Sequence, residues 1–159
     1  MTVPHKFVLM DGNNLFHRQA NMTDRSFGID SMIGMSMHMI LNSMKKEFTN
    51  FKASHAVFFT EGRSWRKGVY PGYKANRTLM HAQKTQQEQE DSAMLIEAFS
   101  DLTAYIDTKT NISMIQHPQA EADDMIHVWI EMHPNDEHIL ISTDSDFIQL
   151  LRFPNVTIY

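Results

Sequence analysis

Cysteine is absent from the 159 residues of this sequence, which excludes a disulfide framework and any metal site built on thiolates. No long apolar run and no signal-peptide pattern is present either. The sequence therefore predicts no membrane span and a cytoplasmic location. Histidine is common, with nine residues, but no two are three or four positions apart. A helix-borne pair of zinc ligands is therefore not expected.

Basic residues are scarce in the second half of the chain. Residues 1–85 hold 12 Lys and Arg against 5 Asp and Glu, a net charge of +7. Residues 86–159 hold 2 against 14, a net charge of −12, and the two parts sum to the overall −5. Such a division suits a protein that grips phosphates with one surface and holds metal ions with another. Two ordinary solvated faces would give the same charges.

Hydrophobic residues make up 42% of the chain, enough for one globular domain over residues 1–159. Strand-like and helix-like segments alternate, which predicts an α/β fold with a mostly parallel central sheet and helices on both faces. In the second helix the apolar stripe is expected at Met32, Met35, Met39 and Ile40. The strands are expected at residues 6–10, 56–59, 112–115, 139–142 and 156–159, and the helices at 14–22, 30–48, 85–107, 122–133 and 147–151.

Acidic residues follow the first four predicted strands. In a parallel sheet the strand ends meet at one edge, where ligands bind. Two such charges 4 Å apart repel by roughly 4 kcal/mol at an effective dielectric of about 20, so a fold that gathers several needs a cation. Oxygen ligands without sulfur favour Mg²⁺ or Mn²⁺. Helix capping alone is the alternative for the acids that open helices. The candidate metal ligands are Asp11, Glu61, Glu121, Asp123, Asp124, Asp144 and Asp146.

A stretch rich in cations and aromatic residues occupies residues 63–77. Arg and Lys neutralise phosphates, and Trp and Tyr can stack on unpaired bases, so this stretch is predicted to bind nucleic acid. Its Gly and Pro residues prevent one continuous helix. Lys74 and Arg77 are expected to be exposed and to face one phosphate backbone. An exposed basic loop without function is the alternative. The candidate contacts are Arg63, Trp65, Arg66, Lys67, Tyr73, Lys74 and Arg77.

Four short motifs, taken in order and spacing, resemble the flap-endonuclease or 5′-nuclease family within the PIN-like nuclease fold. The resemblance covers nearly all of the chain. Within the family, the chain is similar to the phage branch, as in the ribonuclease H of T-even phages, and to the 5′-nuclease domain of DNA polymerase I. The motifs are Val8-Leu9-Met10-Asp11-Gly12, Tyr73-Lys74-Ala75-Asn76-Arg77, Glu121-Ala122-Asp123-Asp124 and Ser142-Thr143-Asp144-Ser145-Asp146.

The resemblance implies an enzyme that hydrolyses phosphodiesters near 5′ ends with up to two Mg²⁺ or Mn²⁺ ions. It implies that the acids are metal ligands or lie next to them, with Asp123 and Asp146 essential for cleavage. Lys74 and Arg77 would hold the scissile phosphate. The substrate would be DNA or an RNA–DNA hybrid, as in primer or flap removal, cut by exonuclease or endonuclease action. If the chain is phage-encoded, it would act in the host cytoplasm.

The sequence departs from this family at two places. Phe59 stands where the family has Asp after the second strand, and Glu61 is expected to substitute. Residues 1–159 are expected to lack the family's C-terminal helix-turn-helix module, so a separately encoded helical module or replication proteins are expected as partners.

Two other interpretations remain open at this point. A phosphatase of the haloacid-dehalogenase type would use an Asp-x-Asp motif like that at Asp144 and Asp146, although there the motif follows the first strand. A non-catalytic or weakly active nucleic-acid-binding derivative would lack the second metal site. A nuclease assay with Mg²⁺ distinguishes the non-catalytic derivative from an active nuclease.

Overall fold

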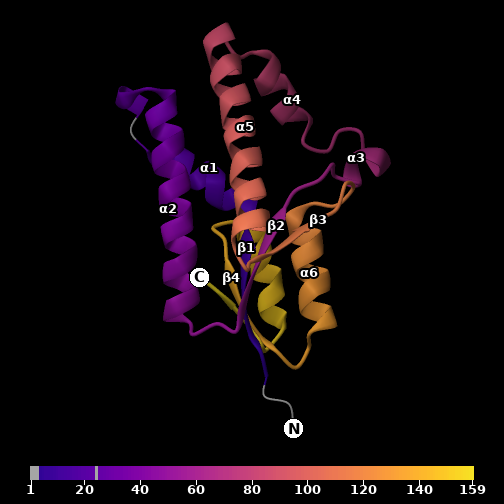
Figure 1. The fold of residues 1–159 in the computed structure, drawn as a ribbon. Coiled ribbons are helices and arrows are strands. Elements are labelled where there is room, and N and C mark those ends of the chain that lie inside the picture. The colour runs from indigo at the N-terminus through magenta and orange to yellow at the C-terminus, as the bar shows by residue number, and fades with distance from the viewer. Residues whose placement is uncertain (1–3, 24) are drawn as a thin grey trace.

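The centre of the protein is a sheet of five parallel strands, in the order β3-β2-β1-β4-β5 (Figure 1). The computed structural model describes residues 4–23 and 25–159; residues 1–3 and 24 of the predicted domain lie outside the described residues. The predicted parallel sheet is confirmed. Its strands are β1 (Lys6–Asp11), β2 (His55–Thr60), β3 (Ser113–Gln116), β4 (Glu137–Ile141) and β5 (Val156–Ile158).

The strand order places β1 at the middle of the sheet. The chain builds β2 and β3 on one side of β1 and then returns to add β4 and β5 on the other side. This reversal creates a topological switch point between β1 and β4, and at such points the carboxyl ends of the strands flank a crevice. The strand ends that carry the acidic residues therefore lie at the binding edge of the sheet.

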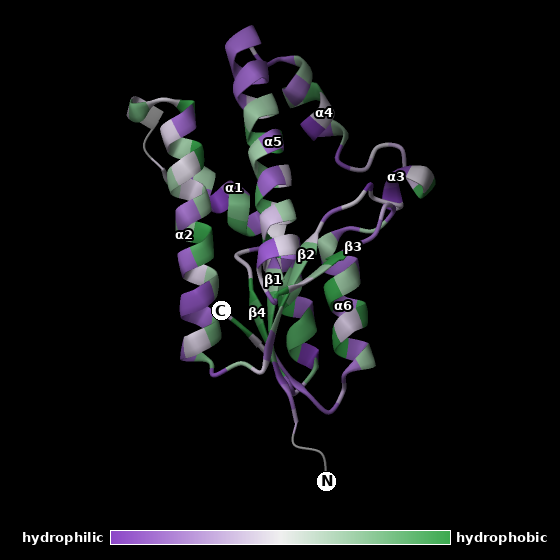
Figure 2. Ribbon diagram, in the orientation of Figure 1, coloured by the Kyte–Doolittle hydropathy of each residue, from purple (hydrophilic) through white to green (hydrophobic). Residues whose placement is uncertain are grey.

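Three helices cover one face of the sheet: α1 (Gly12–Met22), α2 (Ile29–Asn50) and α5 (Gln86–Lys109). Phe16, Ile40 and Leu102 represent this layer, and each is almost fully buried. Burying one such side chain stabilises the fold by about 1.5–3 kcal/mol. Figure 2 shows apolar residues concentrated on the strands and hydrophilic residues at the outer end of α5.

The other face is covered by α6 (Ala122–Met132) and the 3₁₀ helix η2 (Ser145–Arg152). In α6 Ala122, Ile126 and Ile130 are buried, and Trp129 is partly buried against Phe7. The short helix predicted at residues 147–151 exists, but with 3₁₀ geometry. Helices on both faces are thus confirmed.

The predicted stripe of the second helix is partly wrong. Met32 and Ile40 are buried as expected, whereas Met35 is 51% exposed and Met39 is 37% exposed. The buried side of α2 instead follows Met32, Ser36, Ile40, Met44 and Glu47. Because these positions recur every three or four residues, they form one face of the helix, and Met35 and Met39 lie at its border.

A connection with two short helices, α3 (Arg66–Val69) and α4 (Ala75–Ala82), runs from β2 to the outer end of α5 (Figure 1). Pro71 and Gly72 separate the two helices, as the sequence predicts. α5 begins with a capping box in which Thr85 and Glu88 exchange hydrogen bonds. A further 3₁₀ turn, η1 (Arg25–Phe27), precedes α2. Within the described residues, no helix combines the length and apolarity needed to cross a bilayer.

Candidate active site

Asp11 ends the central strand and is buried at the carboxyl edge, at 6% exposure. It also caps α1, because its Oδ1 accepts the backbone N–H of Asn14 at 3.2 Å. The Ser142 hydroxyl donates to its Oδ2 at 3.3 Å. Burial, together with the charges of Glu61 and Asp144, raises the pKa of Asp11 from 3.8 to about 6. A nearby cation would stabilise the ionised form of this buried carboxyl group.

Gly12 brings Asp11 against the neighbouring strand. A Cβ at this position would lie 2.2 Å from the Phe58 ring and 2.8 Å from the Phe59 carbonyl oxygen. Only glycine lets α1 start this close to β2. The two Asn residues that follow hold the adjacent loops: the Asn13 side chain accepts the Glu61 N–H, and the Asn14 side chain accepts from Thr143. Neither Asn was among the site residues expected from the sequence.

Phe59 lies beside Asp11 in the sheet register and is completely buried. Its ring packs near Trp129 on the α6 face, so Phe59 is a core residue. Glu61 lies directly after the end of β2, and its N–H donates to Asn13 Oδ1. Burial raises the pKa of Glu61, while the positive charges of Lys74 and Arg77 lower it. The substitution of Glu61 for the missing acid stays a prediction.

Glu121 is buried beneath the basic stretch and accepts hydrogen bonds from four of its side chains. The Ser64 hydroxyl donates at 2.6 Å, Arg66 at 2.5 Å and the Tyr73 hydroxyl at 3.1 Å, and Lys74 also binds this carboxylate. Burial opposes the ionisation of Glu121, but the bonds from Lys74, Ser64 and Arg66 outweigh it and lower the pKa to about 2. Glu121 is therefore ionised and fully paired at neutral pH.

Asp124 forms the second anchor of the basic stretch. The Arg66 guanidinium donates to it at 2.7 Å and 3.1 Å, and the Trp65 indole N–H donates at 3.1 Å. Asp124 also accepts the Glu121 N–H at 3.2 Å, so capping is part of its role, as the alternative from the sequence held. Asp123 lies 3.5 Å from Arg66, and its pKa is raised, chiefly by burial.

Gly62 explains how these segments meet. A Cβ on Gly62 would lie 1.9 Å from the His117 carbonyl oxygen, so the chain after β2 touches the loop after β3. The Gly62 N–H donates to the Ala120 carbonyl at 2.8 Å, and the Arg63 N–H donates to the Pro118 carbonyl at 2.9 Å. These bonds align the start of the basic stretch with the start of α6.

Asp144 and Asp146 stand on the loop between β4 and η2. Asp144 caps η2 by accepting the Asp146 N–H at 2.9 Å, and its own N–H donates to the Ser142 hydroxyl at 3.1 Å. Asp146 shares an open cavity of about 510 Å³ with Asp123 and Arg66. The two acids expected to be essential for cleavage thus face one space.

The described residues contain one group of acids close enough to share an ion: Glu121, Asp123 and Asp124, with ligand atoms within 4.8 Å of one another. The other four candidates lie outside this trio, but Asp146 shares a cavity with Asp123, and Glu61 senses the charges of Glu121 and Asp123. Their role as metal ligands stays a prediction. The carboxylate donor set fits a hard divalent ion.

The basic stretch divides into paired and free cations. Arg63, Lys67 and Arg77 are exposed. The prediction that Lys74 is exposed is wrong, because its side chain turns toward the buried carboxylate of Glu121. Its φ of 55° places it in the left-handed region, which bends the chain into α4. Lys74 and Glu121 are 47 residues apart in the sequence, and no local pattern predicts that they form a pair.

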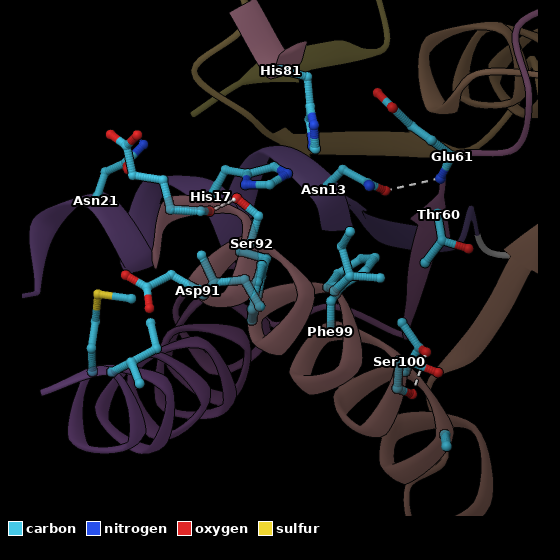
Figure 3. Close-up of a pocket in the computed structure, with 18 of the residues that line it drawn as sticks. Asn13, His17, Asn21, Thr60, Glu61, His81, Asp91, Ser92, Phe99 and Ser100 are labelled. Atoms are coloured by element: carbon cyan, nitrogen blue, oxygen red, sulfur yellow. Dashed lines mark hydrogen bonds between the residues drawn. The ribbon is translucent and has the colours of Figure 1, made fainter. Parts of the chain in front are cut away.

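A larger hollow of about 1180 Å³ lies between α1 and the outer half of α5, beside the acidic edge (Figure 3). Asn13, Glu61 and His81 line its polar side, and Phe16 and Phe99 line its apolar side. Glu61 therefore borders open space as well as the acidic edge.

A parallel α/β sheet with acidic strand ends beneath a basic connection defines a PIN-like fold. The family model of the 5′-3′ exonuclease N-terminal resolvase-like domain matches residues 6–159. The chain therefore belongs to this family, and the family resemblance predicted from the sequence is confirmed. The Asp-x-Asp pair follows β4 rather than the first strand, so the phosphatase interpretation is wrong.

Two curated relatives are similar to this chain. A flap endonuclease Xni of Shewanella piezotolerans is 28% identical over 160 residues, covering 96% of this chain and 54% of the relative. The Xni of Aeromonas salmonicida is 29% identical over 155 residues, with coverages of 94% and 53%. The chain spans about half the length of these curated relatives.

Two structures of phage T5 proteins show the same fold. The T5 5′-exonuclease with bound zinc ions has a TM-score of 0.79 at 23% identity, covering 97% of this chain and 54% of that one. The T5 flap endonuclease in complex with DNA and metal ions has a TM-score of 0.75 at 24% identity, with the same coverages.

Proposed function

We propose that this domain is a divalent-metal-dependent 5′-nuclease that hydrolyses phosphodiesters near the 5′ ends of DNA or RNA–DNA. The observation that carries the proposal is the position of the basic stretch directly over the acidic edge. One set of side chains suits a metal ion and the other suits a phosphate. The family membership and the DNA complex of a structural neighbour support the same reading.

The proposed metal ligands form two subsets. Asp123 and Asp146 face one cavity, with Glu121 and Asp124 beside Asp123. Asp11, Glu61 and Asp144 form the second subset around the end of β1. Mg²⁺ or Mn²⁺ would lower the pKa of a bound water and neutralise charge on the phosphate. Zinc in a structural neighbour supports a divalent site, and Mg²⁺ is our choice because every donor is a carboxylate.

The basic residues are proposed to position the substrate. Arg77 and Lys67 are exposed and available to the phosphate backbone, and Trp65, 52% exposed, offers a face for a base. Lys74 and Arg66 already stand at the acids, within reach of a phosphate held there. An in-line attack of water on phosphorus would then build charge next to both cations, which stabilise it.

A cleavage assay with Mg²⁺ and a 5′-flap substrate tests this function. Asp146→Asn should abolish cleavage while the circular dichroism spectrum stays native. Asp101→Asn, which removes an exposed carboxylate from the side of α5, is the matched control and should cleave as wild type does. If Asp146→Asn retains wild-type cleavage, the proposed site is wrong.

One observation favours a second candidate, a nucleic-acid-binding domain with little or no catalysis. Glu121 and Asp124 are already paired with Lys74 and Arg66, so a cation would have to compete for them. In that case the wild-type domain would bind flap DNA but show no Mg²⁺-dependent cleavage.

A further inference from the structure

Two uncharged residues, Asn13 and Asn14, tie the acidic loops to the end of the central strand. Asn13 Oδ1 accepts the backbone N–H of Glu61 at 2.9 Å, the bond drawn in Figure 3. Asn14 Oδ1 accepts both the N–H and the hydroxyl of Thr143, each at 3.1 Å. The two side chains therefore reach segments that are 48 and 129 residues away in the sequence.

The topology explains why two neighbouring residues can serve two loops. β2 and β4 flank β1 on opposite sides, so the loops that leave them lie on either side of Asp11. Consecutive residues of a helix point about 100° apart, because one turn takes 3.6 residues. Asn13 and Asn14 open α1 directly after Asp11 and thus point to different neighbours.

The tied loops carry the acids that most need restraint. Glu61 follows β2 and Asp144 follows Thr143, and both charges act on the buried Asp11. Like charges push such loops apart when no cation is bound. Hydrogen bonds accepted by the neutral side-chain amides of Asn13 and Asn14 hold the loops without adding a further charge. Ser142 extends the arrangement by donating to Asp11 and accepting the Asp144 N–H.

We propose that Asn13 and Asn14 are positioning residues that fix the spacing of Glu61 and Asp144 relative to Asp11, and so set the affinity for a divalent cation. The inference rests on the proposed function, because it concerns the same metal site. Loss of a residue that orients ligands typically lowers metal affinity 10–100-fold. Neither Asn needs to touch the ion for this effect.

Mn²⁺ titration calorimetry on the 159-residue chain tests the proposal. Asn13→Ala and Asn14→Ala should each weaken Mn²⁺ binding by about 10-fold or more. Asn21→Ala is the matched control, since Asn21 is an exposed residue of the same helix. Asn14→Asp keeps the acceptor oxygen for Thr143 but adds a negative charge, so its effect is read by hydrogen exchange and not by Mn²⁺ affinity.

Amide hydrogen exchange without metal provides an independent readout. Asn13→Ala should speed exchange at the Glu61 amide alone, and Asn14→Ala at the Thr143 amide alone. Asn14→Asp should keep the Thr143 amide protected. A purely structural role would change exchange and stability but leave Mn²⁺ affinity unchanged, and that result would overturn the inference.

The outcomes separate the two proposals. If wild type binds no Mn²⁺, the proposed function fails and this inference fails with it. If wild type binds Mn²⁺ and both Ala variants bind it equally well, only the positioning role is refuted.

Discussion

Replacing Asp11 by Asn should stabilise the metal-free domain while removing its function. The folded state holds the Asp11 carboxyl at a pKa of about 6, against 3.8 ordinarily, because burial disfavours the charged form. A difference of about 2.2 pKa units at 1.36 kcal/mol each corresponds to about 3 kcal/mol. Asn removes this cost and keeps an oxygen that can accept the Asn14 N–H.

The sign of the pH dependence follows from the raised pKa. The folded state binds this proton more tightly than the unfolded chain, so the stability from Asp11 is fully present below pH 3.8 and is lost as the pH rises through about 6. The advantage of Asp11→Asn should therefore be about 3 kcal/mol near pH 7.5 and about half of that near pH 5.

Urea unfolding followed by circular dichroism, with a chelator present, measures this difference. The midpoint should rise in Asp11→Asn with an unchanged slope, and the gain should shrink as the pH falls. Added Mn²⁺ should stabilise wild type more than the variant. Asp101→Asn controls for the loss of a surface charge. A variant less stable than wild type near pH 7.5, or a gain independent of pH, would refute the role of burial.

Three further predictions concern the cations and their partners. Lys74→Ala should lower the free energy of unfolding by about 1–2 kcal/mol, because the buried Glu121 loses one of its hydrogen-bond donors. Arg77→Ala, by contrast, should weaken cleavage and leave the urea midpoint nearly unchanged. The low pKa of Glu121, about 2, contributes stability above pH 4.5 that is lost as the pH falls toward 2. Glu121→Gln should therefore remove this part of the loss of stability on acidification. An acid unfolding curve identical to that of wild type would contradict the pairing. Mg²⁺ at a hundredfold excess over its dissociation constant should stabilise wild type by about 2.7 kcal/mol in calorimetry, and no shift with either Mg²⁺ or Mn²⁺ would argue against the metal site.

Short-range patterns in the sequence predicted the fold well. Continuous apolar runs such as residues 139–141 indicate strands buried on both faces, and polar caps such as Thr85 mark helix starts. Strand ends in a parallel sheet share an edge, so Asp11 and Asp144 could be assigned to one region before the structure was known. The 3₁₀ geometry of η2 was not predictable, because its apolar spacing also fits an α-helix.

The pairing of side chains could not be predicted from the same patterns. Lys74 was expected to be exposed because it is charged and lies in a polar stretch, but Gly62 brings that stretch against the loop before α6. The partner of Lys74 is then decided by packing between distant segments. Asn13 and Asn14 were missed for a related reason, since neutral amides at a strand end usually indicate only a turn.

The central position of β1 has a consequence for the synthesis of this protein on the ribosome. Its first neighbour, β2, is complete at Thr60, but its second neighbour, β4, is complete only at Ile141. Until β4 has been synthesised, one edge of β1 has unpaired backbone groups, which can form hydrogen bonds with strands of other chains. Nascent chains that stop between these two points should therefore aggregate, and a chaperone that covers strand edges should matter most over this interval.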